Sequence, residues 1–105
     1  MRPIAFHPQA LAELGEEALY YNERSPGLGV FFTEQVESAV DLAATMPGIG
    51  SPHLAGTRRV FPKDFPHSIV YREIGETIVI FAVAAFRRKP GYWKNRKWRQ
   101  GSGAV

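Results

Sequence analysis

The chain has 105 residues, of which 45% are hydrophobic and 22% charged, and it contains no cysteine. This length and composition are typical of one globular domain with one core, and the lack of cysteine excludes disulfides and thiolate chemistry. The net charge of +3 hides a strong division, because residues 1–86 hold six Lys and Arg against ten Asp and Glu, whereas residues 87–105 hold seven basic residues and no acidic one. An acidic body with a basic end predicts a polyanionic partner.

The sequence gives no reason to expect export or membrane insertion. The N-terminus lacks the apolar run and cleavage site of a signal peptide, and the longest apolar stretch, residues 78–86, is too short to span a bilayer. A chain without cysteine fits a reducing compartment. We therefore expect a cytoplasmic protein that makes no membrane contact.

The first quarter of the chain predicts a short strand followed by a helix. Residues 4–6 suit a strand, and Pro8 suits the first turn of a helix that we expect to end near Glu23. Helical spacing places four side chains in one apolar stripe, namely Leu11, Leu14, Ala18 and Tyr21. The glutamates of this helix lie largely outside the stripe, namely Glu13, Glu16, Glu17 and Glu23.

A second helix is predicted directly after the first. Ser25 and Pro26 form a start signal, with serine as the N-cap, and Pro47 and Gly48 end the helix. Its buried face is expected to hold Phe32, Val36, Ala39 or Val40, and Ala43. Because the connection is so short, the two helices should form an antiparallel hairpin.

The rest of the chain predicts strands. Residues 47–56 are rich in glycine and proline and are expected to form a loop, after which residues 58–61, 67–74 and 77–86 have strand character. The order of elements is therefore β-α-α-β-β-β with a basic tail. Residues 101–105 are expected to be disordered from their composition and their terminal position.

Four short motifs carry a resemblance to a known family. They are Phe6-His7-Pro8 before an acidic helix, Arg59-Val60-Phe61, the segment Phe-Pro-His-Ser-Ile-Val-Tyr-Arg at 65–72, and Phe-Arg-Arg-Lys-Pro-Gly-Tyr-Trp at 86–93. Together they resemble the RelE/ParE superfamily of toxins from bacterial type II toxin–antitoxin systems, also described as plasmid stabilisation proteins. The last two motifs are closer to the ParE-like and unclassified members than to the messenger-cleaving ones.

The resemblance implies an α+β fold in which an antiparallel two-helix hairpin packs on a twisted, mainly antiparallel sheet that includes the N-terminal strand. It implies a single toxin domain over residues 1–98, with a flexible tail at 99–105. It also implies a cognate antitoxin that neutralises the toxin in a hetero-oligomer. RelE-like members cut messenger RNA in the ribosome, whereas ParE-like members inhibit DNA gyrase.

Four residues are candidates for catalysis: Arg59, Arg87, Arg88 and Tyr92. Cleavage of RNA without a metal needs a proton acceptor, a proton donor and cations for the charged transition state. Arginine suits a phosphate because its planar fork donates two hydrogen bonds, and Tyr92 could transfer a proton or stack on a base. His67 or Lys89 could serve as an additional acid or base.

Structural interpretations stand beside these roles. Arginines on strands, here Arg58, Arg59 and Arg72, are more often salt-bridged or solvated than catalytic. Tyr92 and Trp93 are equally well explained as large aromatic side chains that fasten the tail by packing. A histidine at the start of a strand, such as His67, is more often structural.

Other chemistries are excluded by the pattern of residues. The three histidines are scattered and have no cysteine beside them, and the glycine pairs lack the setting of a dinucleotide site, so no metal and no cofactor are expected. Three functions stay open: inhibition of DNA gyrase, ribosome-dependent cleavage of messenger RNA, and binding of nucleic acid by a nontoxic basic module.

Overall fold

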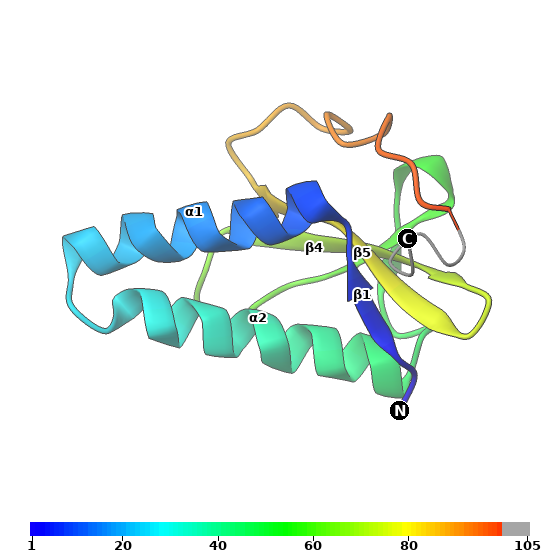
Figure 1. Cartoon of the computed structure of the whole chain (residues 1–105), viewed down its shortest axis with the longest axis horizontal. Coiled ribbons are helices and arrows are strands. Elements are labelled where there is room, and N and C mark those ends of the chain that lie inside the picture. The colour runs from blue at the N-terminus through cyan, green and yellow to red at the C-terminus, as the bar shows by residue number, and fades with distance from the viewer. Residues whose placement is uncertain (100–105) are drawn as a thin grey trace.

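In the computed structural model, which describes residues 1–99, two helices cover one face of a five-stranded sheet (Figure 1). The helices are α1 (Pro8–Arg24) and α2 (Leu28–Thr45). The strands are β1 (Ile4–Phe6), β2 (Ser51–Pro52), β3 (Arg58–Val60), β4 (His67–Ile74) and β5 (Thr77–Ala85). The residues 101–105 for which we expect disorder lie outside the described part of the chain.

The strands are ordered β1-β5-β4-β3-β2 across the sheet. β1 runs parallel to β5, whereas every other neighbouring pair is antiparallel. The predicted α+β fold, with a helical hairpin on a mainly antiparallel sheet, is confirmed. Within residues 1–99, no helix is long and apolar enough to cross a membrane.

Two boundaries differ from the prediction. The expected loop at 47–56 contains the two-residue strand β2, which a proline can join because it lies at the sheet edge. α2 begins at Leu28 rather than at Pro26, and its N-cap is Gly27 with φ 87°. The side-chain oxygen of Asn22 accepts hydrogen bonds from the N–H groups of Gly27 and Gly29, so this asparagine sets the start of α2. Ser25 instead caps the C-terminus of α1.

The helices approach each other most closely at Gly29. A Cβ atom there would lie 2.1 Å from the carbonyl oxygen of Ala18, which is far inside van der Waals contact. Only glycine therefore permits this distance between α1 and α2. The close approach brings the predicted apolar face of α2 onto the sheet, where Phe32, Val36, Ala39, Val40 and Ala43 are all buried.

The predicted apolar stripe of α1 is partly wrong. Leu11 is 56% exposed, whereas Glu13 and Glu17 are buried. Leu14 does pack against the core together with Ala18 and Tyr21. The two glutamates are buried because this part of α1 faces β5 and the chain that follows it, where both carboxylates find basic partners.

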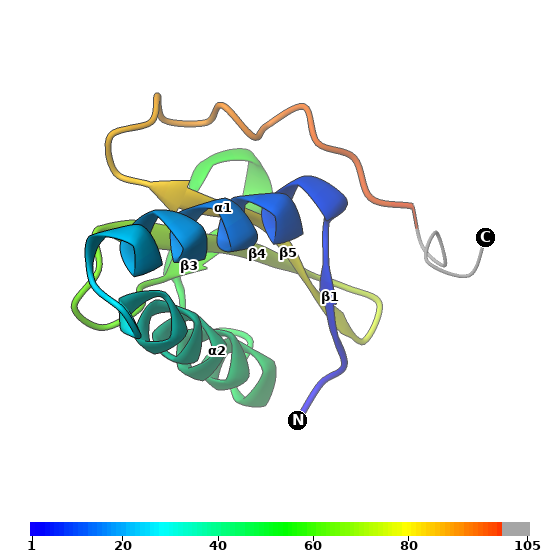
Figure 2. The same ribbon diagram turned by 60° about the vertical axis from the view of Figure 1, so that its left-hand side comes forward.

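The opposite face of the sheet is covered by the segment that follows β5. This segment, residues 87–99, is called the strap below; it turns back and runs beside the sheet (Figure 2, orange to red). Trp93 of the strap is 3% exposed and packs on Val70, Ala82 and Ala84. The basic end is thus fastened to the fold rather than extended from it.

Candidate functional site

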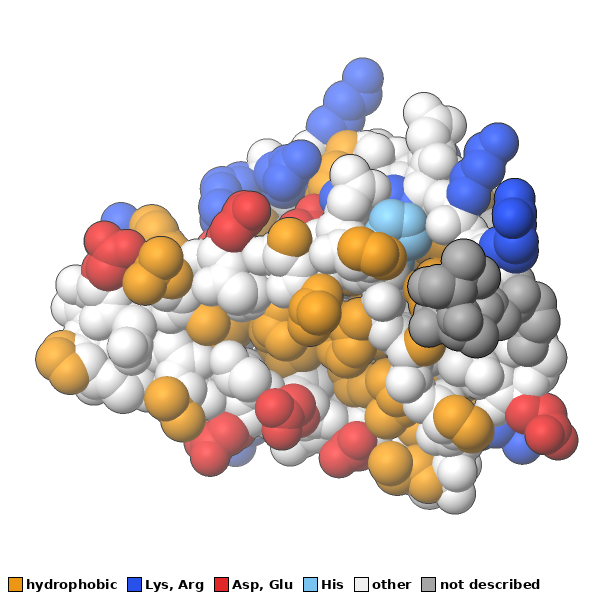
Figure 3. Space-filling model, viewed as in Figure 1, with side chains coloured by type: hydrophobic (Ala, Val, Ile, Leu, Met, Phe, Trp, Pro, Cys, Tyr) orange, Lys and Arg blue, Asp and Glu red, His pale blue; other side chains and the backbone are white. Residues whose placement is uncertain are grey.

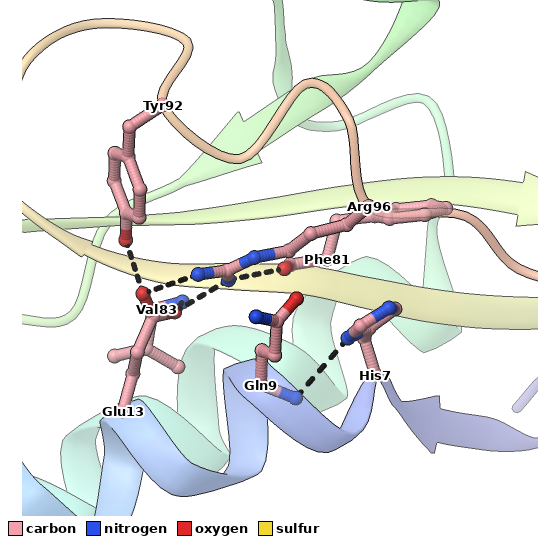
Figure 4. Close-up of polar contacts among 7 residues, drawn as sticks. All are labelled: His7, Gln9, Glu13, Phe81, Val83, Tyr92 and Arg96. Carbon is pink, nitrogen blue, oxygen red and sulfur yellow. Dashed lines mark hydrogen bonds and ion pairs between the residues drawn. The ribbon is translucent and has the colours of Figure 1, made fainter.

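The strap is held where the edge of β5 has no strand beside it. β1 pairs with β5 only as far as Ile80, so the backbone beyond this residue needs other partners. The N–H of Val83 donates to Oε1 of Glu13 at 3.1 Å, and the carbonyl oxygen of Phe81 accepts from Arg96 at 2.9 Å (Figure 4). A carboxylate from α1 and a guanidinium from the strap therefore replace a missing strand.

Glu13 and Arg96 form a two-pronged ion pair. The Nη1–Oε1 and Nη2–Oε2 distances are both 2.8 Å, and both side chains are only 11% exposed. Burial alone would raise the pKa of the Glu13 carboxyl, but the hydrogen bonds from Arg96 and Tyr92 outweigh it and lower the pKa below its usual value. The pair is therefore fully charged at neutral pH.

Tyr92 is bound into the same cluster. Its hydroxyl donates to Oε2 of Glu13, and burial together with this hydrogen bond raises its pKa far above the ordinary value. The guanidinium carbon of Arg88 lies 3.9 Å from the centre of the Tyr92 ring, a cation–π contact. Tyr92 therefore stays protonated at neutral pH.

A second carboxylate, Glu17, holds two basic groups. Its Oε1 lies 3.0 Å from Nη2 of Arg87 and 3.2 Å from Nε2 of His67. His67 is completely buried, and burial lowers its pKa despite the opposing effect of Glu17. The predicted candidate Arg87 is thus paired, and His67 lies where no substrate can reach it.

Three of the four predicted candidates do converge. Arg59, Arg88 and Tyr92 line one pocket of about 90 Å³ beneath the strap, and His53 and Lys89 line it as well. This volume is well below the ~300–1,000 Å³ of pockets that enclose small ligands, but it accommodates a single oxyanion group. Arg87 faces a different pocket, beside α1.

The pocket is electrostatically one-sided. None of its lining residues is acidic, and among the described residues Nε of Arg59 is buried without a hydrogen-bond partner. The ring of His53 lies 5.7 Å from that of Trp93, and burial and the charge of Arg59 lower its pKa. His53 is therefore neutral at physiological pH, and the pocket favours an anion.

Sequence reasoning missed Glu13, Glu17, Arg96 and His53. The two glutamates are four residues apart on α1, a spacing that places them on one helix face, but the sequence does not show what that face meets. Nothing in the sequence singles out His53. Arg58 and Arg72 do have structural contacts: Arg58 donates to the carbonyl oxygen of Gly50 at 2.7 Å, and Arg72 lies over the Phe81 ring.

The remaining cations of the strap form an exposed basic strip. Arg87 and Arg96 are neutralised by carboxylates, whereas five others have no acidic partner within residues 1–99: Arg88, Lys89, Lys94, Lys97 and Arg99. Figure 3 shows the Lys and Arg side chains along the strap and most acidic side chains over the helices. The charge division read from the sequence is therefore also a division in space.

The buried ionisable groups predict a two-step loss of stability in acid. His67 binds a proton less readily in the folded state than at its usual pKa of 6.5, so the free energy of unfolding should begin to fall below about this pH. Because folding lowers the pKa of Glu13 from 4.5, its contribution is present above pH 4.5 and is lost as the pH falls through the folded value.

Urea unfolding measured between pH 7.5 and 3 tests this expectation. The first loss should be smaller in a His67→Gln variant, in which His7 and His53 keep their lowered pKa values, while the second loss should persist. A wild-type curve that is flat from pH 7.5 to 5.5 would contradict a buried, neutral His67.

Comparison with known proteins places this geometry in context. The sequence model of the family described as "ParE toxin of type II toxin-antitoxin system, parDE" matches residues 4–90. A solved structure described as "Chromosomal ParDE TA system from P. aeruginosa" has a TM-score of 0.71 and 18% identity, over 81% of this chain and 96% of that one. At this identity the likeness concerns the fold. Among curated protein sequences, none matches the chain significantly. Tyr92, Trp93 and Arg96 lie beyond the matched span.

Proposed function

Since the chain belongs to the ParE toxin family of type II toxin–antitoxin systems, we propose that it arrests growth by binding to DNA gyrase through its basic end. A cognate antitoxin neutralises it. The action proposed is inhibition by binding rather than catalysis.

The observation that carries this choice is the engagement of the Tyr92 hydroxyl. Cleavage of RNA requires groups that accept and donate protons at the reacting atoms. Tyr92 instead donates a hydrogen bond to Glu13, which also accepts hydrogen bonds from Arg96, and the raised pKa of Tyr92 opposes its ionisation. A tyrosine held in this way fastens the strap and supports Arg88 from below.

The basic strip supports a target that carries nucleic acid. Five cations of the strap without acidic partners in the described chain give one side of the molecule a positive potential. Such a surface attracts polyanions and increases the rate of association with them. Gyrase with its bound DNA offers a surface of this kind.

A second candidate function, ribosome-dependent cleavage of messenger RNA, has one specific observation in its favour. His53 lines the same pocket as Arg59 and Arg88, and its lowered pKa keeps the imidazole able to accept a proton. In this alternative the arginines would bind the scissile phosphate, and His53 would be the general base.

The experiment that separates these functions compares purified variants in two assays. Supercoiling by gyrase is measured alongside primer extension on messenger RNA with and without programmed ribosomes. We expect the wild-type protein to block supercoiling and to leave RNA intact. Arg88→Ala should weaken inhibition about 10- to 100-fold, the effect of losing one charged hydrogen bond or two. Tyr92→Phe should weaken inhibition less than Arg88→Ala does, because the ring stays beneath Arg88 although its hydroxyl bond to Glu13 is lost.

Arg24→Ala is the matched control, since it removes the same charge from the C-terminal end of α1. Ribosome-dependent breaks that disappear in a His53→Gln variant would establish the ribonuclease instead. A protein that neither inhibits gyrase nor cleaves RNA would instead be a nontoxic basic module. Co-expression of the small protein encoded beside the toxin should restore growth, and growth arrest that no neighbouring protein relieves would count against the antitoxin.

The antitoxin has two distinct surfaces to cover. The groove between the helices is lined by exposed Leu19 and Val30, and the strap is basic. We therefore expect an amphipathic helix or strand laid over the hairpin and sheet, with acidic side chains that mask the strip.

A further inference from the structure

The position of Arg88 depends on a chain of contacts that ends at Arg96. Arg88 has no acidic partner within residues 1–99, and its guanidinium rests on the ring of Tyr92 at 3.9 Å. The hydroxyl of that ring is held by Glu13, and Glu13 is held by both prongs of Arg96. Arg88 is thus held by Tyr92, Tyr92 by Glu13, and Glu13 by Arg96.

Arg96 also contacts the two other parts of this arrangement directly. Its guanidinium donates to the Phe81 carbonyl on the open edge of β5, and its Cζ lies 5.1 Å from the centre of the Tyr92 ring. Figure 4 shows the Arg96 side chain between the backbone of the strap and α1, with Tyr92 and Arg96 meeting at the Glu13 carboxylate. Arg96 is 11% exposed, so it cannot itself present its charge to a large partner.

Resting on the proposed function, we infer that Arg96 is a positioning residue: through Glu13 and Tyr92 it sets the place of Arg88 on the inhibitory surface. The residue lies six positions beyond the span matched by the ParE family model, which ends at residue 90. Tyr92 and Arg96, which make the fastening, therefore both lie outside the part of the chain that matches the family model. Arg96 thus affects the surface that carries Arg88, although Arg96 itself is buried and is not part of that surface.

Nuclear magnetic resonance of the arginine side chains tests this inference without reference to any target. Protons of Arg88 that lie over the Tyr92 ring should be shifted upfield by the ring current. In Arg96→Lys, which keeps the charge but loses the two-pronged geometry, this shift should largely disappear. Arg59, which lies over Phe61 at 5.2 Å, is an internal control whose shift should persist in every folded variant.

A double-mutant cycle in the supercoiling assay then tests the consequence. Arg96→Lys should weaken inhibition at least about tenfold, yet should cost nothing further in the Arg88→Ala background, because both changes remove the same contact. Arg24→Ala removes a charge from the C-terminal end of α1, outside both the strip and the cluster, and should cost less than about threefold. If Arg96→Lys fails to fold, Glu13→Gln/Arg96→Gln removes the pair without leaving a buried charge.

The two experiments distinguish a failure of the positioning role of Arg96 from a failure of the proposed function. An unchanged Arg88 shift, or equal losses from Arg96→Lys with and without Arg88, would overturn the positioning role. A wild-type protein that does not inhibit gyrase would refute the proposed function, and the resonance measurement would still decide whether Arg96 positions Arg88.

Discussion

Replacement of Glu13 by alanine is expected to lower the free energy of unfolding by about 3–5 kcal/mol, the cost of leaving one member of a buried ion pair without its partner. The change removes the acceptor for Arg96, for the Tyr92 hydroxyl and for the Val83 N–H at once. Since a domain of this size is stable by only ~5–15 kcal/mol, the substitution would remove a large share of the stability.

Urea denaturation at pH 7 measures this effect, and Glu16→Ala is the matched control. Glu16 lies on the exposed side of the same helix and has no ion-pair partner among residues 1–99, so its removal should change stability by no more than about 0.5 kcal/mol. Equal effects of the two substitutions would mean that the Glu13–Arg96 pair contributes little in solution.

Substitution of Gly29 by alanine is the second change with a large expected effect. The new methyl group would lie 2.1 Å from the carbonyl oxygen of Ala18 and 3.1 Å from Cβ of Asn22. Because the nearest atom belongs to the backbone of α1, the helices must separate, at a cost of roughly 1–3 kcal/mol or more. Each kcal/mol corresponds to about 4–8 °C in Tm for a domain of this length.

Gly15→Ala controls for the general effect of glycine in a helix. No atom lies within 4 Å of a Cβ built at Gly15, so alanine there should stabilise α1 by about 0.5–1 kcal/mol. Thermal unfolding should therefore shift in opposite directions for the two variants. A Gly29→Ala protein as stable as the wild type would show that the hairpin is not packed this closely.

Most of the fold could be predicted from local patterns. The apolar periodicity of α2 and the β-branched run of β5 depend on neighbouring residues alone, and both elements lie where their sequences indicate. The predicted start of α2 was wrong because Ser25 and Pro26 look like a helix start in the sequence. In the fold, the side chain of Asn22 instead accepts hydrogen bonds from Gly27 and Gly29. β2 could not be predicted, because two residues are too few to show the alternating pattern of a strand.

The candidate site could be predicted only by its charge. The seven basic residues at the end of the chain are visible in the sequence, but the choice of which are neutralised depends on contacts across the whole chain. Glu13 and Glu17 look like ordinary exposed helix residues until the strap is placed beside them. The convergence of Arg59 with Arg88 likewise needed the pairing of β3, β4 and β5.

The pairing of Glu13 with Arg96 also determines when, during synthesis, the basic end can become ordered. These residues are 83 positions apart, and β1 likewise needs a distant partner, because Ile4 pairs with Ile78 of β5. At roughly 5–20 residues per second, a ribosome needs about 4–17 seconds to make the chain between the two members of the pair. We expect the nascent protein to stay without its ordered basic end throughout this interval. The basic end that we propose to be inhibitory can thus become ordered only after Arg96 has been made.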